Sequence, residues 1–180
     1  MAPTPPVVRK HFVNPCMLFV HWEEHVIATL LGSCVSVCLW DTRLGYGGIN
    51  HYMLPLWNGA GLPTPKYGNI AIEKLIQNLN NLGCRKEDLI AKVFGGANVI
   101  NLGREAFSVG ERNIHIAKET LGRHGIPIRA IEVGGGHAMK IEFNSKTGIV
   151  IVRKVSQNSG VPSTLPEAQA YHLKSSSSTQ

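Results

Sequence analysis

Short apolar runs separated by turn residues dominate the chain from about Val7 to Leu54. Four of them have the length and the bounding residues of β-strands: CMLFVHW (16–22), HVIATLLG (25–32), VSVCLWD (35–41) and YGGINHYML (46–54). Short apolar runs bounded by glycine and polar residues are typical of strands in a sheet. This part of the chain therefore predicts a strand-rich structure.

Two later segments carry the 3.6-residue apolar period of amphipathic helices. The first is predicted to begin at a capping Asn69, after a Pro- and Gly-rich loop over 55–68, and to stop at Gly83. Its apolar face consists of Ile72, Leu75, Ile76, Leu79 and Leu82. The second is predicted from about Glu111 to His124, with Ile114, Ala117 and Leu121 on one side and Gly125 as terminator.

The remaining segments complete one domain. AKVFGG (91–96) and IPIRAIEV (126–133) are predicted strands, GGGH (134–137) a loop, and residues 140–155 a hairpin. We expect a flexible N-terminus over 1–6, a domain over 7–156, and a disordered, polar tail over 157–180. The fold class predicted is α/β, with both strands and helices in a single domain.

Composition narrows the possible settings. No apolar run approaches the ~18 residues of a membrane span, and the N-terminus lacks the apolar core of a secretory signal, so we expect a cytoplasmic protein without membrane insertion. The four cysteines are then expected to be free thiols. The net charge is +6, but the basic residues are scattered and no zinc-finger or RNA signature is visible, so nucleic acid is not an expected partner.

The segment around DTRLG (41–45) predicts a contact between a cysteine and a histidine. DTRLG has turn chemistry between two strand-like runs, so a hairpin is expected. Pairing Asp41 with Gly45 gives a register in which Cys34 and His51 lie nearly opposite, within one residue of bulge, with Cβ atoms roughly 5 Å apart. A neighbouring imidazole can take the thiol proton and create an ion pair that favours a nucleophilic thiolate.

Other interpretations of these residues are a buried apolar cysteine and a zinc site. A cysteine in a β-rich protein is more often a small buried apolar residue, and we expect this of Cys16, Cys38 and Cys84. A zinc site of Cys34, Cys38 and His51 is disfavoured, because four strand residues separate the two sulfurs by about 13 Å. Gly32 and Ser33 let the backbone turn sharply before Cys34, which can leave N–H groups free for an oxyanion. With Asn50 they are the candidate oxyanion or site-lining residues, and no metal or cofactor is expected.

At these residues the chain resembles the chemoreceptor glutamine deamidase family, CheD. The resemblance covers roughly residues 10–155 and rests on LLGSCVSVCLWD (30–41), GGINHYMLP (47–55), KVFGGANV (92–99) and VGGGHAMKIEFNSKTGIVIVRKV (133–155). It implies a sandwich of mixed β-sheets flanked by helices, similar to toxin-type cysteine deamidase domains. It also implies hydrolysis of glutamine side chains on the cytoplasmic helices of methyl-accepting chemoreceptors, through a thioester, and regulation in some members by the phosphatase CheC.

The resemblance implies a catalytic cysteine at Cys34, a catalytic histidine at His51 and a threonine six positions before the cysteine. Ala28 occupies that last position, and the adjacent Thr29 is the candidate in its place. Because neighbouring strand residues point to opposite faces, Thr29 is expected to serve only after a local register shift. Two alternatives stay open: another cysteine acyl transferase or peptidase, and a non-catalytic adaptor that binds CheC or the receptor. The free protein is expected to be a monomer.

Overall fold

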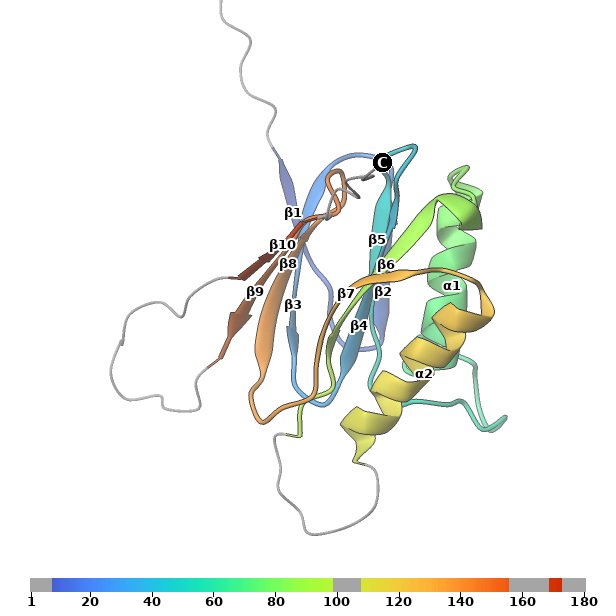
Figure 1. Ribbon diagram of the computed structural model, residues 1–180. Helices are drawn as coiled ribbons and strands as arrows, with labels where there is room; N and C mark the ends of the chain where they lie inside the picture. Colours follow the sequence, from blue (N-terminus) through green and yellow to red (C-terminus); the bar gives the residue numbers. More distant parts are fainter. Residues whose placement is uncertain (1–7, 99–107, 156–168, 173–180) are drawn as a thin grey trace, which may run out of the picture.

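Three layers make up the protein in the computed structural model, which describes residues 8–98, 108–155 and 169–172. The outer sheet has the strand order β1-β3-β8-β9-β10, and the inner sheet has the order β2-β5-β4-β6-β7. Helices α1 and α2 cover the other face of the inner sheet (Figure 1). This α/β sandwich of two sheets and flanking helices confirms the predicted fold class.

Both sheets are mixed. The outer-sheet strands are β1 (Arg9–Phe12), β3 (His25–Leu31), β8 (Met139–Asn144), β9 (Val150–Lys154) and β10 (Gln169–Tyr171). The inner-sheet strands are β2 (Met17–His21), β5 (Gly47–His51), β4 (Val35–Asp41), β6 (Leu89–Gly95) and β7 (Ile128–Val133). The pairs β1–β3 and β6–β7 are parallel, and the other neighbours are antiparallel.

Two apolar cores lie on the two faces of the inner sheet. On one face of β4, Val35, Val37 and Leu39 belong to the core beneath the helices. Cys38 points the other way and belongs to the core between the sheets. Strand β4 is therefore covered on both faces, which explains why its sequence VSVCLWD is a nearly continuous apolar run instead of an alternating one.

The helices end where the sequence predicts, but α1 starts differently. Helix α1 spans Gly68–Asn81, and Gly83 follows it at φ +92°. Its N-cap is Tyr67 and no side chain caps it, so the prediction of an Asn69 cap is wrong. Asn69 Oδ1 instead accepts a hydrogen bond from the backbone N–H of Trp57, at 3.0 Å, and so fastens the preceding loop.

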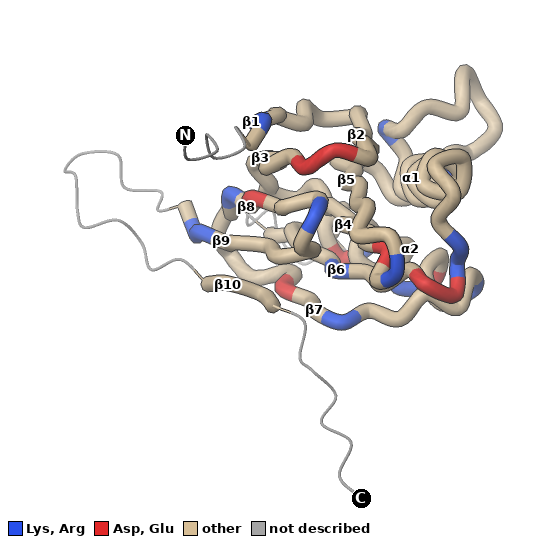
Figure 2. The backbone as a smooth tube through the Cα atoms, turned by 90° about the horizontal axis from the view of Figure 1, so that it is seen from above, with Lys and Arg blue, Asp and Glu red and all other residues tan. Residues whose placement is uncertain are grey.

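Helix α2 (Val109–Arg123) is fixed at its start by a capping box of Ser108 and Glu111. A short 3-10 turn, η1 (Lys86–Asp88), connects α1 to β6. Among the described residues, no helix is long and apolar enough to cross a membrane. The Lys and Arg positions are spread around the molecule and not gathered on one face (Figure 2).

Strand β10 corrects the prediction of a disordered tail for its three residues. It pairs antiparallel with β9 at the edge of the outer sheet. The ammonium of buried Lys92 donates to the backbone oxygens of Tyr171 and Gly148, both at 2.7 Å, and the Tyr171 hydroxyl donates to Glu132. A buried ammonium needs such acceptors, and this requirement holds the segment in place. The predicted flexible residues 1–6 and most of the predicted tail lie outside the described residues.

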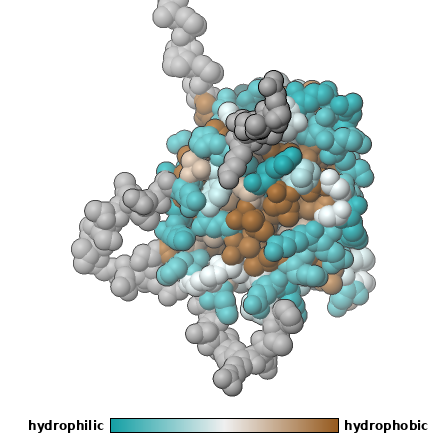
Figure 3. Space-filling view, in the orientation of Figure 1, coloured by the Kyte–Doolittle hydropathy of each residue, from teal (hydrophilic) through white to brown (hydrophobic). Residues whose placement is uncertain are grey.

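On the same side of the sandwich as β10, the inner sheet ends in β7, whose side chains are partly exposed. Figure 3 shows apolar surface in the middle of the face on which β7 lies in front of β6. Ile128 and Val133 pack against the core beneath the helices, while Ile131 is 42% exposed. Strand β7 is thus the edge strand of the inner sheet, and the surface around it is apolar in its centre.

Candidate active site

The β4–β5 hairpin places Cys34 and His51 on the same face, two rungs apart. Trp40 pairs with Gly47, Cys38 with Ile49 and Val35 with Tyr52. Continuing this register, Cys34 lies opposite Met53, and His51 lies opposite Ser36. Cys34 and His51 are therefore diagonal neighbours on the face toward the outer sheet, not directly opposite as the sequence predicts.

The register differs because the turn is one residue longer than predicted. The backbone N–H of Asp41 donates to Tyr46, not Gly45, at 2.8 Å. The Asp41 carboxylate accepts from the N–H groups of Arg43 and Leu44, and Gly45 turns the chain at φ +63°. An aspartate that binds the backbone two and three residues ahead builds a wider turn, and this displaces every pair by one residue.

Thr29 reaches the site from the outer sheet. It is fully buried, with 0% exposure, and its hydroxyl lies 2.8 Å from Nδ1 of His51. Strand β3 pairs with β8 without a break from Val26 to Leu31, so no register shift is needed. The expectation that Thr29 serves only after such a shift is wrong, because Thr29 already points between the sheets while Ala28 points outward.

The hydrogen bonds of Thr29 determine which nitrogen of His51 carries the proton. The Thr29 hydroxyl donates its one hydrogen to the carbonyl of Val13, at 2.8 Å. It can then only accept from His51, so Nδ1 is the protonated nitrogen. Nε2 keeps its lone pair, is buried and has no hydrogen-bond partner among the described residues. His51 therefore presents a free basic nitrogen on the face that also carries Cys34.

Burial shifts both groups toward their neutral forms. It lowers the pKa of His51, although the Val13 carbonyl acts in the opposite direction. Burial also raises the pKa of the half-buried Cys34 thiol, and neighbouring Cys16 raises it further, while the backbone N–H of Cys34 itself lowers it. These directions favour a neutral thiol beside a neutral imidazole over the ion pair that the sequence suggests.

The residues before Cys34 hold the backbone in place through their carbonyls. The Gly32 carbonyl accepts from Ala97 N–H, and the Cys34 carbonyl accepts from Gly96 N–H, both at 2.8 Å. The Ser33 carbonyl accepts from the side chain of Asn113. The backbone N–H of Cys34 lowers the pKa of its own thiol, which makes it a candidate donor to an oxyanion on a carbon attached to the sulfur. Gly32 and Ser33 thus shape the turn, and Cys34 itself supplies the candidate donor.

Asn50, a candidate site-lining residue, takes part in the strand pairing through its side chain. Its side-chain oxygen accepts from the N–H of Val37, at 2.9 Å, and the Ser36 hydroxyl donates to its backbone oxygen. The side chain of Asn50 thus replaces a backbone carbonyl in the β4–β5 ladder, directly beside His51. This engagement makes Asn50 a part of the strand pairing; its Nδ2 is buried without a partner among the described residues.

The glycines of the FGG segment allow the chain to pass close to Cys34. Gly95 has φ +102°, and a Cβ at this position would lie 2.3 Å from the carbonyl oxygen of Cys34. The carbonyl of Gly95 accepts from Gly134 N–H, at 2.9 Å, which connects the second glycine cluster to the first. Both clusters therefore support the turn that carries the thiol.

We expect Gly95→Ala to lower the free energy of unfolding by about 3 kcal/mol or more, since the strained φ and the contact with Cys34 add up. Gly134→Ala is the matched control, because Gly134 also has a positive φ (+79°) but nothing lies within 4 Å of its added Cβ. It should cost about 1–2 kcal/mol. Urea unfolding of both variants measures the difference. Equal destabilisation would contradict the close approach at Cys34.

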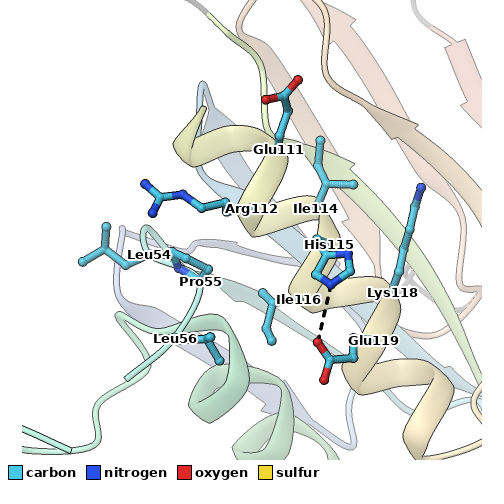
Figure 4. A pocket seen from close by; sticks show the side chains of 10 residues that line it. All are labelled: Leu54, Pro55, Leu56, Glu111, Arg112, Ile114, His115, Ile116, Lys118 and Glu119. Atoms are coloured by element: carbon cyan, nitrogen blue, oxygen red, sulfur yellow. Dashed lines mark ion pairs between the residues drawn. The ribbon is translucent and has the colours of Figure 1, made fainter. Parts of the chain in front are cut away.

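A groove lies on the helix side of the inner sheet, between α2 and the chain that follows His51. It encloses about 1000 Å³. It is lined by Leu54, Pro55, Leu56, Glu111, Arg112, Ile114, His115, Ile116, Lys118 and Glu119 (Figure 4). His115 and Glu119 form an exposed ion pair at 3.7 Å. None of the three residues Thr29, Cys34 and His51 lines this groove, so it is a neighbouring surface and not the reaction centre.

Comparison with known proteins identifies the family. A family model described as CheD chemotactic sensory transduction matches residues 53–154, more than half of the chain. A protein of Trichlorobacter lovleyi named "Probable chemoreceptor glutamine deamidase CheD" is 50% identical over 150 residues, covering 83% of this chain and 93% of that protein. This chain belongs to the CheD family. A protein of the same name from Sulfurimonas denitrificans is 45% identical, covering 82% of this chain and 96% of its own.

Within this CheD chain, the part matched by the family model begins two residues after His51. The matched part contains both glycine clusters. Cys34 and His51 lie before it, so the evidence for them as site residues is their position in the structure. Sequence reasoning missed Val13 and Asn113. Val13 acts through its carbonyl, which no side-chain pattern reveals. Asn113 left a detectable signal, because it lies three and four residues before Ile116 and Ala117 on the buried side of α2, where an apolar residue is expected.

Proposed function

We propose that this chain hydrolyses glutamine side chains of chemoreceptors to glutamate, with Cys34 as nucleophile, His51 as general base and Thr29 as the group that orients His51. The main support for this proposal is the hydrogen bond between Thr29 and His51 Nδ1. It leaves His51 Nε2 without a partner among the described residues, on the same face of the inner sheet as Cys34. The names of CheD relatives, "Probable chemoreceptor glutamine deamidase CheD", supply the reaction and the substrate class.

The reaction proceeds in two halves. His51 Nε2 takes the proton of the Cys34 thiol as the sulfur attacks the carboxamide carbon, and the Cys34 N–H donates to the oxyanion. The C–N bond breaks as His51 returns the proton to the leaving nitrogen, which departs as ammonia and leaves a thioester. His51 then takes a proton from water, whose oxygen attacks the thioester carbon. The glutamate side chain leaves, and the proton returns to the sulfur.

Thr29 orients the imidazole of His51 so that its Nε2 can act as the base. By accepting from Nδ1–H, its hydroxyl fixes the tautomer and the orientation of the ring, and it stabilises the imidazolium that forms when Nε2 is protonated. The hydroxyl is itself held by the Val13 carbonyl, so the chain Val13–Thr29–His51 crosses from one sheet to the other. This arrangement has the logic of a nucleophile, a base and an orienting group.

The substrate and the binding partners of this chain belong to the same proposal. The substrate would be the cytoplasmic helices of a chemoreceptor, which places the chain on the cytoplasmic side of the membrane. The groove between α2 and the chain after His51, apolar at Leu54, Pro55 and Leu56 and charged along α2, is the surface that we assign to such a helix. Regulation by the phosphatase CheC, a monomeric free state and the absence of a cofactor stay predictions.

The test is incubation of the full chain with a receptor cytoplasmic fragment, followed by peptide mass spectrometry and an ammonia assay. We expect glutamine residues to gain the mass difference between a carboxamide and a carboxylate, with one ammonia released for each. Cleavage of the fragment would favour a peptidase, and incorporation of an added primary amine would favour an acyl transferase. An unmodified fragment that nevertheless binds the chain would favour the adaptor.

A further inference from the structure

Asn113 joins the two chain segments that carry Cys34 and His51. It lies in α2, is fully buried at 0% exposure, and its Nδ2 donates to the carbonyls of Ser33 and Met53, at 3.0 and 2.9 Å. Its own backbone carbonyl accepts from the Tyr52 hydroxyl, at 2.7 Å. One amide group thus bridges the residue before the thiol and a residue just after the histidine.

The bridge is placed where the strand pairing stops. The last rung of the β4–β5 ladder is the reciprocal pair of backbone bonds between Val35 and Tyr52. Beyond it, a continued ladder would pair Ser33 with Leu54, but the Leu54 N–H donates to Lys66, and Asn113 binds the carbonyls of Ser33 and Met53 instead. The ladder is also modified inside this rung, where the Asn50 side chain accepts from Val37. The position of Cys34 relative to β5 therefore depends on the Asn113 amide more than on regular pairing.

The chemistry of Asn113 does not match a residue selected for packing alone. Its Oδ1 is buried and has no hydrogen-bond partner among the described residues, which costs free energy. Reversing the amide would set Oδ1 against two carbonyl oxygens, so the observed orientation is the favourable one. Asparagine is also a weak helix former. An apolar residue of similar size would avoid these costs but could not hold Ser33 and Met53.

We propose that Asn113 is a positioning residue of the active site. It holds the ends of β4 and β5 so that the Cys34 thiol and its backbone N–H keep their orientation toward the reaction centre. The inference rests on the proposed function for its kinetic consequence, but the contacts that carry it do not involve the substrate. Asn113 touches neither the thiol nor the imidazole, so it acts through the backbone.

Two variants separate positioning from folding. Asn113→Leu keeps the branched shape and removes the unpaired oxygen, but it is larger and leaves the Ser33 and Met53 carbonyls without their donor, so we expect it to fold with a lower unfolding temperature. Asn113→Asp keeps the shape but cannot donate and turns a charge toward two carbonyls. For both, kcat for glutamine deamidation should fall on the order of 100-fold with KM nearly unchanged, because the reacting atoms are displaced. Thr120→Ala, a buried polar change farther along α2, is the matched control and should keep kcat.

The rate of Cys34 alkylation by iodoacetamide against pH provides the readout that needs no substrate. Loss of the bridge should move the thiol titration to higher pH, because the thiolate loses its aligned N–H donor. If Asn113→Leu is folded and keeps both the wild-type kcat and the wild-type alkylation profile, the proposal is wrong. A wild-type protein that does not deamidate would refute the proposed function, while the alkylation comparison would still decide the role of Asn113.

Discussion

Cys34→Ala is expected to lower the rate of glutamine deamidation by about 10⁴-fold or more, because without the sulfur no thioester can form. Fold and substrate binding should persist, since Cys34 is half-buried at the start of β4 and contributes only at the margin of the core between the sheets. The measurement is the rate of ammonia release from a receptor fragment at saturating enzyme.

Cys84→Ala is the matched control for the loss of a thiol. Cys84 is buried in the core beneath the helices, on the other side of the inner sheet. Burial and the neighbouring Asp41 raise the pKa of its thiol to about 12, so it has almost no thiolate at neutral pH. This variant should deamidate at the wild-type rate below its unfolding temperature. If Cys34→Ala kept full activity, Cys34 would not be the nucleophile. The same conclusion would follow if Cys84→Ala kept its fold but lost activity.

His51→Gln is expected to lower kcat/KM by about 10²–10⁴-fold, the usual contribution of a positioned general base. Glutamine fills a similar space, so packing between the sheets changes little. His25→Gln is the matched control, because His25 is also a buried histidine of this sandwich but lies at the start of β3 with its ring bonded to the Glu23 backbone. That variant should keep the wild-type rate.

The pH dependence follows from the direction of the His51 shift. Burial lowers the pKa of His51, so its basic form persists to lower pH than that of an exposed histidine. The active base is the neutral ring, and kcat/KM should therefore rise with pH along one acid limb centred below about 6.5, then stay level. Thr29→Val removes the acceptor that stabilises the imidazolium, so its limb should move to still lower pH while the plateau rate falls. A limb centred above pH 7 would contradict this assignment.

Much of the fold was predictable because it depends on local patterns of apolar and polar residues. The apolar runs before Leu54 form β2 to β5, and the periodic segments form α1 and α2. What failed depends on interactions that are not local. The hairpin register was wrong by one residue because the Asp41 carboxylate widens the turn. Strand β10 was missed because its position depends on Lys92, a buried cation seventy-nine residues away in sequence.

The candidate site shows the same division. Cys34 and His51 share a face because both belong to one hairpin. Cys34 was predicted opposite His51 and lies opposite Met53, two residues farther along the strand, which preserves the face. Thr29 comes from the other sheet, and its contact with His51 depends on how the two sheets stack, which the sequence of β3 alone does not determine. The Val13 carbonyl and the Asn113 amide act through the backbone of other segments, so their roles become visible only in three dimensions.

The most direct test of the central claim is to place an electrophilic glutamine analogue in a receptor peptide, incubate it with the full chain, and map the adduct by mass spectrometry. We expect one covalent adduct, on Cys34, whose rate of formation falls in His51→Gln and Thr29→Val. An adduct on Cys16, Cys38 or Cys84, or labelling of Cys34 at the same rate in all three proteins, would contradict it.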